Sequence, residues 1–548
     1  TFTITVNPTA QVNQPTNQVV CNGDDVDVLF TTENIFGLTS YSWTSDTQIG
    51  AGLSDSGDMN FIAINSSTAP VEATIIVTPT FEFDNVVCDG EAKTFIITVN
   101  PTAQVDQTVD QVVYNQGTTT PVLFTTQNIG GTTTYTWTNN TPSIGLSGSG
   151  SGDILAFTAT NTISTPVVAT ITVTPTFENG GVVCDGEDET FTITVNPTAQ
   201  VDDITNQVVC NLDEVSVLFS TQNTSGTSIY SWTSDIEIGA GLSGTGDMNF
   251  TAINTSTAPV VASINVTPTF TSGGITNIGD VISFTITVNP TAQVDQPLDQ
   301  LVCNGEGVSV LFTTQNTGGS TSYSWISDTQ IGAGLSGNSD MNFIATNLST
   351  EPVVATITVT PTFENGGIVC DGEDKTFTIT VNPTAQIDQP VNRVVCNGDT
   401  TSIVEFTTQN TGGTTTYIWT NNTPSIGLSG SGSGDILAFT ATNSSTEPVV
   451  ATITVTPTFE NGGIVCDGED KTFTITVNPT AQVDQPANQV VCNGEDVSVL
   501  FNSQNTLGST TYTWINNNSS IGLSDSGSGD TIAFTATNSS TEPVVATI

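Results

Sequence analysis

The sequence predicts an all-β protein: a tandem array of small Greek-key β-sandwiches that together form an elongated rod. First, the stretch TFTITVNPTAQ at the start of the chain returns five times with at most one change, at intervals of 93 or 96 residues. Second, apolar residues alternate with Thr and Ser in short runs, which is the pattern of half-buried strands and not of helices. Third, turn residues such as NTGG, GSGSGD and ENGG separate these runs every 8–12 residues, as in a sandwich.

Each interval is long enough to bury one small core and too short for two. We therefore expect residues 1–7 to be the last strand of a preceding repeat, with six further repeats after it. The expected repeats are 8–100 (repeat 1), 101–196 (repeat 2), 197–289 (repeat 3), 290–382 (repeat 4), 383–478 (repeat 5) and 479–548 (repeat 6, truncated).

The strands of a repeat follow from the period-2 pattern, taken in chain order. The opening run TFTITV directs Phe2, Ile4 and Val6 to one face and ends at Asn7-Pro8. Four later runs are expected to turn the following side chains inward: Val215, Val217 and Phe219 in VSVLFST; Tyr135 and Trp137 in TYTWT; Leu155, Phe157 and Ala159 in LAFTA; and Val167, Ala169, Ile171 and Val173 in PVVATITVTPTF.

One tryptophan recurs in every repeat, always in the motif Tyr-x-Trp. A recurring Trp could stack on sugars, but an aromatic side chain at an inward strand position is usually part of the core. We therefore assign to the core Trp43, Trp137, Trp232, Trp325, Trp419 and Trp514.

The charge balance excludes several classes of partner. The chain has 53 acidic residues, four basic residues and no histidine, for a formal net charge of −49. Binding to nucleic acid or to an anionic membrane surface needs Lys and Arg, so neither is expected. No apolar run approaches the roughly 18 residues of a membrane span, so membrane insertion of this segment is not expected either.

A family resemblance rests on motifs that recur along the whole chain. The order is CNG, Tyr-x-Trp-T, IGLSGSGSGDILAFTATN, ATITVTPTFE, CDGE and FTITVNP. This pattern resembles the PKD-like and immunoglobulin-like repeats of giant Bacteroidota cell-surface proteins, which are exported by the type IX system and include the mobile adhesin of gliding bacteria. The resemblance implies an extracellular, filamentous and adhesive setting at the cell surface, and it supplies no catalytic residues.

Cysteines occupy two sites per repeat, an early site in VVCNG and a late site in VCDGE. The early site is lost in repeat 2, where Tyr114 stands, and the late site is lost in repeat 3, where GGITNIGD stands. An extracellular protein is expected to pair its cysteines in disulfides. Pairing within a repeat would leave Cys184 and Cys210 as orphans, and pairing each late site with the next early site would leave Cys88 and Cys303.

If each early site pairs with the late site of the next repeat, the two missing cysteines belong to the same bond, because Tyr114 would face the late site that repeat 3 lacks. In a sandwich of this type the early site lies at the end that faces the next repeat, and the late site lies at the opposite end, in the last hairpin. The predicted disulfides are Cys21–Cys184, Cys210–Cys370 and Cys303–Cys466. Cys88, Cys396 and Cys492 are expected to stay unpaired within residues 1–548.

Acid-rich turns beside the cysteines suggest a metal site at such a junction, with calcium as the candidate ion. The candidate ligands are Asp24, Asp25, Asp185, Glu187 and Asp188, and the alternative is a solvated acidic rim.

No catalytic machinery is evident: hydrolase chemistry lacks its histidine, and the carboxylates Asp89 and Glu91 belong to a loop that recurs along the chain. We expect a structural stalk whose main partners are the neighbouring repeats. The alternative is a module that binds surface glycans or other cell-surface components weakly at many sites.

Overall fold

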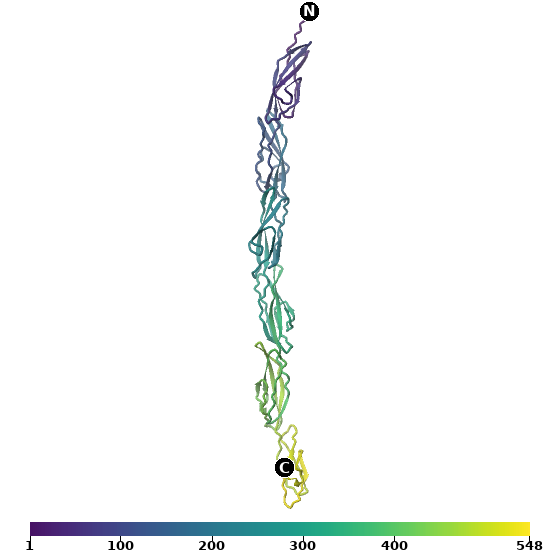
Figure 1. Ribbon diagram of the computed structural model, residues 1–548, viewed down its shortest axis with the longest axis vertical. Coiled ribbons are helices and arrows are strands. Elements are labelled where there is room, and N and C mark those ends of the chain that lie inside the picture. The colour runs from purple at the N-terminus through teal and green to yellow at the C-terminus, as the bar shows by residue number, and fades with distance from the viewer. The chain divides into compact units, whose positions relative to one another are not determined.

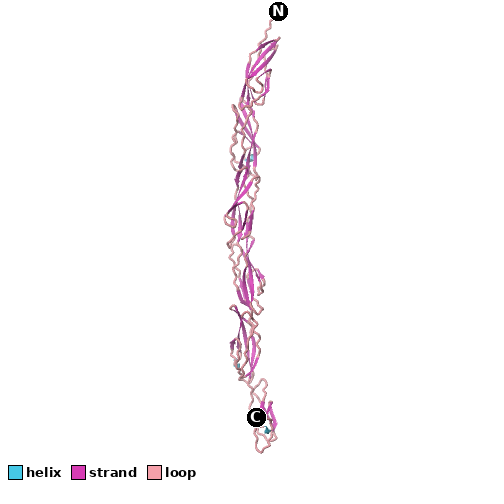
Figure 2. Ribbon diagram, in the orientation of Figure 1, coloured by secondary structure: helices cyan, strands magenta, loops and turns pink.

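The computed structural model describes residues 1–548, and nearly all of its regular structure is β-strand (Figure 2). The strands are β1 to β40, accompanied by three single 3-10 turns, η1 to η3. The chain forms two compact units: unit 1 comprises residues 1–254 and 260–288, and unit 2 comprises residues 255–259 and 289–548. No helix is long and apolar enough to cross a membrane.

Repeat 1 shows the common architecture of the repeats. Its elements are β1 (Gln18–Cys21), β2 (Asp25–Val28), β3 (Leu38–Ser45), β4 (Ser54–Ser56), β5 (Met59–Ile62), β6 (Val71–Phe83), β7 (Val86–Asp89) and β8 (Lys93–Asn100). The larger sheet has the order β1-β8-β6-β3-β4, with β7 paired to β6, and the second sheet is the ladder β2-β5. Strand β1 runs parallel to β8, and every other pair is antiparallel.

The same plan recurs along the chain, which Figure 1 colours by residue number. Repeat 2 contains β9 (Gln111–Tyr114), β10 (Thr132–Asn139), η1 (Pro142–Ile144), β11 (Ser149–Ser151), β12 (Val167–Asn179), β13 (Val182–Asp185) and β14 (Glu189–Asn196). Repeat 3 contains β15 (Gln207–Cys210), β16 (Glu214–Val217), β17 (Thr227–Ser234), β18 (Ser243–Thr245), β19 (Met248–Thr251), β20 (Val260–Ser272), β21 (Ile275–Ile278) and β22 (Ile282–Asn289).

In unit 2, repeat 4 has the elements of repeat 1, repeat 5 has those of repeat 2, and repeat 6 has only some of them. Repeat 4 contains β23 (Gln300–Cys303), β24 (Gly307–Val310), β25 (Ser320–Ser327), β26 (Ser336–Gly337), β27 (Met341–Ile344), β28 (Val353–Asn365), β29 (Ile368–Asp371) and β30 (Lys375–Asn382). Repeat 5 contains β31 (Arg393–Cys396), β32 (Thr414–Asn421), η2 (Pro424–Ile426), β33 (Ser431–Ser433), β34 (Val449–Asn461), β35 (Ile464–Asp467) and β36 (Lys471–Asn478). Repeat 6 contains β37 (Asp496–Leu500), β38 (Thr513–Ile515), η3 (Ser519–Ile521), β39 (Ser526–Ser528) and β40 (Thr531–Thr535).

The core of each sandwich is built by alternation along its strands. On β12, Ala169, Ile171 and Val173 are fully buried, and the residues between them are not. The recurring tryptophan lies in the core in repeats 1 to 5, as predicted, and is half-buried in repeat 6. Five separate apolar clusters form, and each draws its residues from a single repeat.

The predicted inward face of LAFTA is confirmed at Ala159, which is fully buried, and is wrong at Leu155. Ile154 is buried, whereas Leu155 is exposed and Phe157 is only half-buried. Repeat 2 has one residue more between Asp153 and Ala159 than repeat 1 has between its equivalent Asp and Ala. Repeat 6 has the same extra residue and still forms the ladder β37–β40, so this residue alone does not explain the change. The facing segment is also one residue longer in repeat 2, from Tyr114 to Phe124, and contains Pro121, and here the ladder is reduced to isolated bridges.

Residues 1–7 have no strand partner within residues 1–548, and their assignment as the last strand of a preceding repeat stays a prediction. A strand needs hydrogen-bonding partners on a neighbouring strand, and residues 1–6 pair with none in this structure. Phe2, Ile4 and Val6, which were expected to face a core, are therefore exposed.

Candidate functional site: the junctions between repeats

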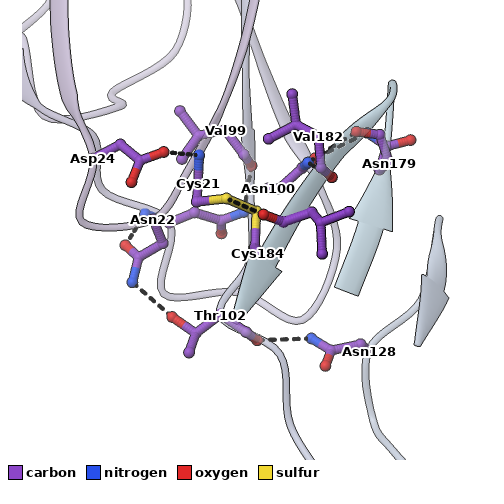
Figure 3. Close-up of a disulfide and its surroundings, with 12 residues drawn as sticks. Cys21, Asn22, Asp24, Val99, Asn100, Thr102, Asn128, Asn179, Val182 and Cys184 are labelled. Carbon is purple, nitrogen blue, oxygen red and sulfur yellow. Dashed lines mark hydrogen bonds between the residues drawn. A yellow bond between two sulfur atoms is a disulfide. The ribbon is translucent and has the colours of Figure 1, made fainter. Parts of the chain in front are cut away.

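The most distinctive chemistry lies where one sandwich meets the next. Cys21, at the end of β1 in repeat 1, forms a disulfide with Cys184 on β13 of repeat 2, with 5.4 Å between the two Cα atoms (Figure 3). Cys303, at the end of β23 in repeat 4, is bonded in the same way to Cys466 on β35 of repeat 5. Each bond lies within one unit, and both are bonds that the cysteine pattern predicts.

The remaining cysteines divide into two groups. Cys210–Cys370 would join unit 1 to unit 2, and this pairing stays a prediction. Cys88, Cys396 and Cys492 are free thiols in the structure.

A buried asparagine supports each junction beside the disulfide. Asn100, the last residue of β8, is fully buried and donates from Nδ2 to the backbone carbonyl of Asn179, at 3.0 Å. The Asn179 amide donates in return to Asn100 Oδ1 at 2.9 Å (Figure 3). The hairpin β12–β13 of repeat 2 is thereby held against the end of repeat 1 by its own turn.

The same asparagine clamp recurs along the chain. Equivalent bonds to the hairpin turn are donated by Asn7 to Phe83, Asn196 to Ser272, Asn289 to Asn365 and Asn382 to Asn461. From the sequence, the Asn-Pro of NPTAQ indicates only the end of a strand, and the hydrogen bond of this asparagine to the next repeat is not predicted. The detectable signal was a polar residue that recurs at the end of every inward-alternating run.

A second loop contact lies on another side of the junction. Asn223 donates to the carbonyl of Ser164 in the preceding repeat, at 3.3 Å, and to that of Thr198, at 3.1 Å. Thr317 makes the equivalent contact through its backbone N–H, which donates to the Thr257 carbonyl at 2.8 Å. At the two junctions with a printed sulfur–sulfur bond the same loop contact is made by the backbone N–H of Ile129 to the Thr68 carbonyl and of Thr411 to the Thr350 carbonyl, so hydrogen bonds accompany the disulfide there.

The glycine after the late cysteine is required by a close approach of two backbones. A Cβ on Gly186 would lie 2.1 Å from the carbonyl oxygen of Ala103, which no side chain allows. Gly186 forms a parallel bridge with Ala103, the residue of the NPTAQ segment that begins repeat 2. The CDG motif therefore packs the late-site loop onto the segment that links two repeats.

The junction between repeats 2 and 3 replaces the disulfide with different contacts. Asn277 stands at the late-site position and donates to the backbone carbonyl of Pro197, at 3.0 Å, in a buried environment. Tyr114, at the early site, is about half exposed, and the Asn196 clamp to Ser272 remains at 2.8 Å. The sequence predicts that this junction has no disulfide, but it does not predict the hydrogen bond from Asn277 that takes the place of the disulfide.

The predicted calcium ligands are not brought together. Asp24 Oδ2 accepts from the backbone N–H of Cys21 at 2.8 Å, and Asp188 accepts from the Thr174 hydroxyl at 2.5 Å. No group of three or more acidic, cysteine or histidine side chains in residues 1–548 could hold a metal ion. Asp24 thereby caps its own turn, and Asp188 is held by the neighbouring strand β12.

Comparison with known proteins gives no family. No family model matches the sequence, and no curated protein matches it. Among solved structures, the N-terminal eight Ig domains of Down Syndrome Cell Adhesion Molecule align at 10% identity, covering 97% of this chain and 81% of that chain with a TM-score of 0.19. Drosophila N-cadherin EC1-4 aligns at 13% identity, covering 67% of this chain and 99% of that chain with a TM-score of 0.24. Likenesses at this level say nothing about ligand or activity.

Proposed function

We propose that this chain is a stalk section of a long extracellular adhesin, which holds a distal binding tip away from the cell and transmits force. One observation carries the proposal: neighbouring sandwiches are joined by a covalent link in addition to the peptide chain, Cys21–Cys184 in unit 1 and Cys303–Cys466 in unit 2. A protein that only displayed independent binding modules would have no use for such links.

The disulfides change how tension passes through the chain. Cys21 and Cys184 are 163 residues apart in sequence, yet their Cα atoms are 5.4 Å apart. Tension that reaches Cys21 along the chain crosses the sulfur–sulfur bond to Cys184. Residues 22–183, which the bond encloses, therefore bear no load even after the sandwiches unfold. Fully stretched, a segment of that length would span about 550 Å, and the bond withholds this extension.

The asparagine clamps and the composition support the same function. A buried amide such as Asn100 resists separation of two sandwiches because pulling them apart leaves buried polar groups without partners. Disulfides form and persist in oxidising surroundings outside the cell. The net charge of −49 favours a well-solvated surface that resists non-specific association.

The alternative, weak binding of glycans or other cell-surface components at many repeats, lacks a recurring platform. Phe36 and Phe83 are exposed aromatic side chains in repeat 1. The position of Phe36 is Gly130 in repeat 2, and that of Phe83 is Asn179. Avidity needs the same contact in many repeats, and these two contacts occur once.

Single-molecule stretching of the whole chain tests the stalk proposal. In the oxidised protein, the residues enclosed by Cys21–Cys184 and by Cys303–Cys466 should not add to the length of the stretched chain. A reducing agent should add about 550 Å of contour length for each disulfide that it opens. Equal extension before and after reduction would refute the force-transmitting role. A glycan array probed with the same chain would favour the alternative if it showed strong binding that Phe36→Ala leaves intact.

A further inference from the structure

The chain contains seven Asn-Gly pairs, and the structure divides them into two groups. Asn-Gly is the pair that most readily loses its side-chain amide, because glycine has no Cβ to hinder its backbone nitrogen from reaching the amide carbon. The turn group opens the glycine turn of a late hairpin and consists of Asn179, Asn365 and Asn461. The CNG group follows the cysteine of the early site and consists of Asn22, Asn304, Asn397 and Asn493.

In the CNG group, hydrogen bonds hold both of the groups that would have to react. The backbone N–H of Gly23 donates to the Ala63 carbonyl at 2.8 Å. The side-chain oxygen of Asn22 accepts from the backbone N–H of Asn65 at 2.8 Å. A nitrogen and an amide that are both fixed in this way do not meet, so these asparagines should be stable in the folded chain. The same two bonds recur at Asn304, Asn397 and Asn493.

In the turn group, the nitrogen is free and only the side chain is held. Asn179 ends β12 opposite Val182, and Gly180 lies exposed in the turn between them with a φ of +64°. The Gly180 N–H donates to no acceptor within residues 1–548. The Asn179 amide donates across the junction to Asn100 Oδ1 at 2.9 Å (Figure 3). The same bond across a junction is made by Asn365 and Asn461.

We infer that Asn179, Asn365 and Asn461 are deamidation sites that react when a junction opens, and that the product prevents the asparagine clamp from closing again. The closed clamp protects the amide, because the bond to Asn100 holds the side chain on the neighbouring repeat. Once that bond is broken, the amide carbon is free to turn towards the nitrogen of Gly180. The amount of product therefore records how often a junction has opened.

The reaction needs only water as a co-reactant. The Gly180 nitrogen attacks Cγ of Asn179, a carbon–nitrogen bond forms, the bond from Cγ to Nδ2 breaks, and ammonia leaves with the proton of the Gly180 N–H. The product is a five-membered cyclic imide. Water then adds to either of its two carbonyl carbons and opens the ring, which leaves aspartate or isoaspartate at position 179.

Both products remove the donor that the clamp uses. In aspartate, a carboxylate oxygen replaces Nδ2, so an acceptor faces Asn100 Oδ1 where a donor did before. In isoaspartate, the main chain is one carbon longer, which displaces the Asn179 carbonyl that Asn100 Nδ2 binds at 3.0 Å. Asn100 is fully buried and loses partners in either case. The Cys21–Cys184 bond still links the two sandwiches, so the junction loosens without coming apart.

Repeat 3 supplies a matched control for this site. Ser272 stands at the position of Asn179, and Asn196 still donates to the Ser272 carbonyl at 2.8 Å. Asn179→Ser should therefore keep the half of the clamp that uses the backbone carbonyl, and it has no amide to lose. Asn179→Asp places the direct product at the same position.

The test incubates the folded 548-residue chain in a slightly alkaline buffer and follows each Asn-Gly peptide by mass spectrometry and chromatography, which distinguish asparagine, aspartate and isoaspartate. The turn group should convert, and the CNG group should stay intact. After reduction and unfolding in urea, all seven asparagines should convert at similar rates. In the folded chain, Asn100→Ala should raise the rate at Asn179 about 5-fold, the factor that corresponds to one net hydrogen bond, and should leave the rate at Asn461 unchanged.

Hydrogen exchange in the turn at residues 179–182 measures the effect on the clamp. Exchange should be faster in Asn179→Asp and in the converted chain than in the fresh chain, and in Asn179→Ser it should not change during incubation. Four results would each overturn the inference: conversion of Asn22 in the folded chain as fast as that of Asn179, an Asn179 that stays intact in the folded chain, an unchanged rate at Asn179 in Asn100→Ala, or equal exchange in Asn179→Asp and the fresh chain.

Discussion

Removing the disulfide between repeats 1 and 2 should lower the stability of repeat 1 by several kcal/mol. The perturbation is Cys21→Ser, Cys184→Ser or both, made in the full chain. If both repeats unfolded together, the loop of 163 residues would give a loss of about 5 kcal/mol in the chain-entropy model.

The loop that matters is shorter when repeat 1 unfolds and repeat 2 stays folded. Its two ends are then Cys21 and the start of repeat 2 near Asn100, both held by the folded repeat 2. A loop of about 80 residues corresponds to about 4.5 kcal/mol. For a domain of this size, 1 kcal/mol moves the melting temperature by roughly 5 °C, so the transition of repeat 1 should fall by about 20 °C.

Differential scanning calorimetry of the oxidised chain measures this shift. The two single variants and the double variant should give the same shift, because each removes the same bond. Cys396→Ser, at a free thiol, is the matched control and should leave the transitions in place. A shift of only a few degrees for all three variants would show that the bond does not restrict the unfolded chain as reasoned.

Three further predictions concern the junctions and the core. Asn100→Ala leaves buried carbonyl and amide groups of the β12–β13 turn without partners, so the junction should lose about 1–3 kcal/mol, seen as faster hydrogen exchange in that turn and not in the turn of repeat 5. Tyr114→Cys with Asn277→Cys should form a disulfide between repeats 2 and 3 and raise the melting temperature of repeat 2; a free-thiol assay that still counts both cysteines would contradict the equivalence of the two sites. Burial raises the pKa of the Tyr-x-Trp phenols above the ordinary value of 10, so the folded state holds these protons more tightly than the unfolded state does. The stability that these groups contribute should be fully present below pH 10 and should fall as the pH rises through the folded pKa. Absorbance at 295 nm follows the ionisation, and titration of the folded protein at the ordinary pKa would contradict the prediction. The tyrosines concerned are Tyr41, Tyr135, Tyr230, Tyr323 and Tyr417.

The strands, the core and two disulfides follow from the sequence because their causes are local or repeated. Alternation places Ile171 and Val173 on the buried face whatever lies opposite, since successive side chains of a strand point to opposite sides. The repeat supplies the rest: comparison of equivalent positions shows that Tyr114 and the lost late-site cysteine belong to one junction. A single sandwich would have left the pairing of its cysteines open.

What only the tertiary structure decides is how separate segments meet in space. Asn100 donates a 3.0 Å hydrogen bond to the turn of the next repeat, and Gly186 packs so closely on Ala103 that a Cβ would lie 2.1 Å from its carbonyl oxygen. The neighbours of these residues in sequence give no hint of either contact. The burial of Ile154 in place of Leu155 depends on the facing segment, where Val122 bridges to Ile154, and local patterning does not contain that pairing. The acidic turns look like metal ligands in the sequence, yet Asp24 accepts from the backbone of its own turn and Asp188 from Thr174 on β12. These hydrogen bonds depend on distances that the order of residues does not contain.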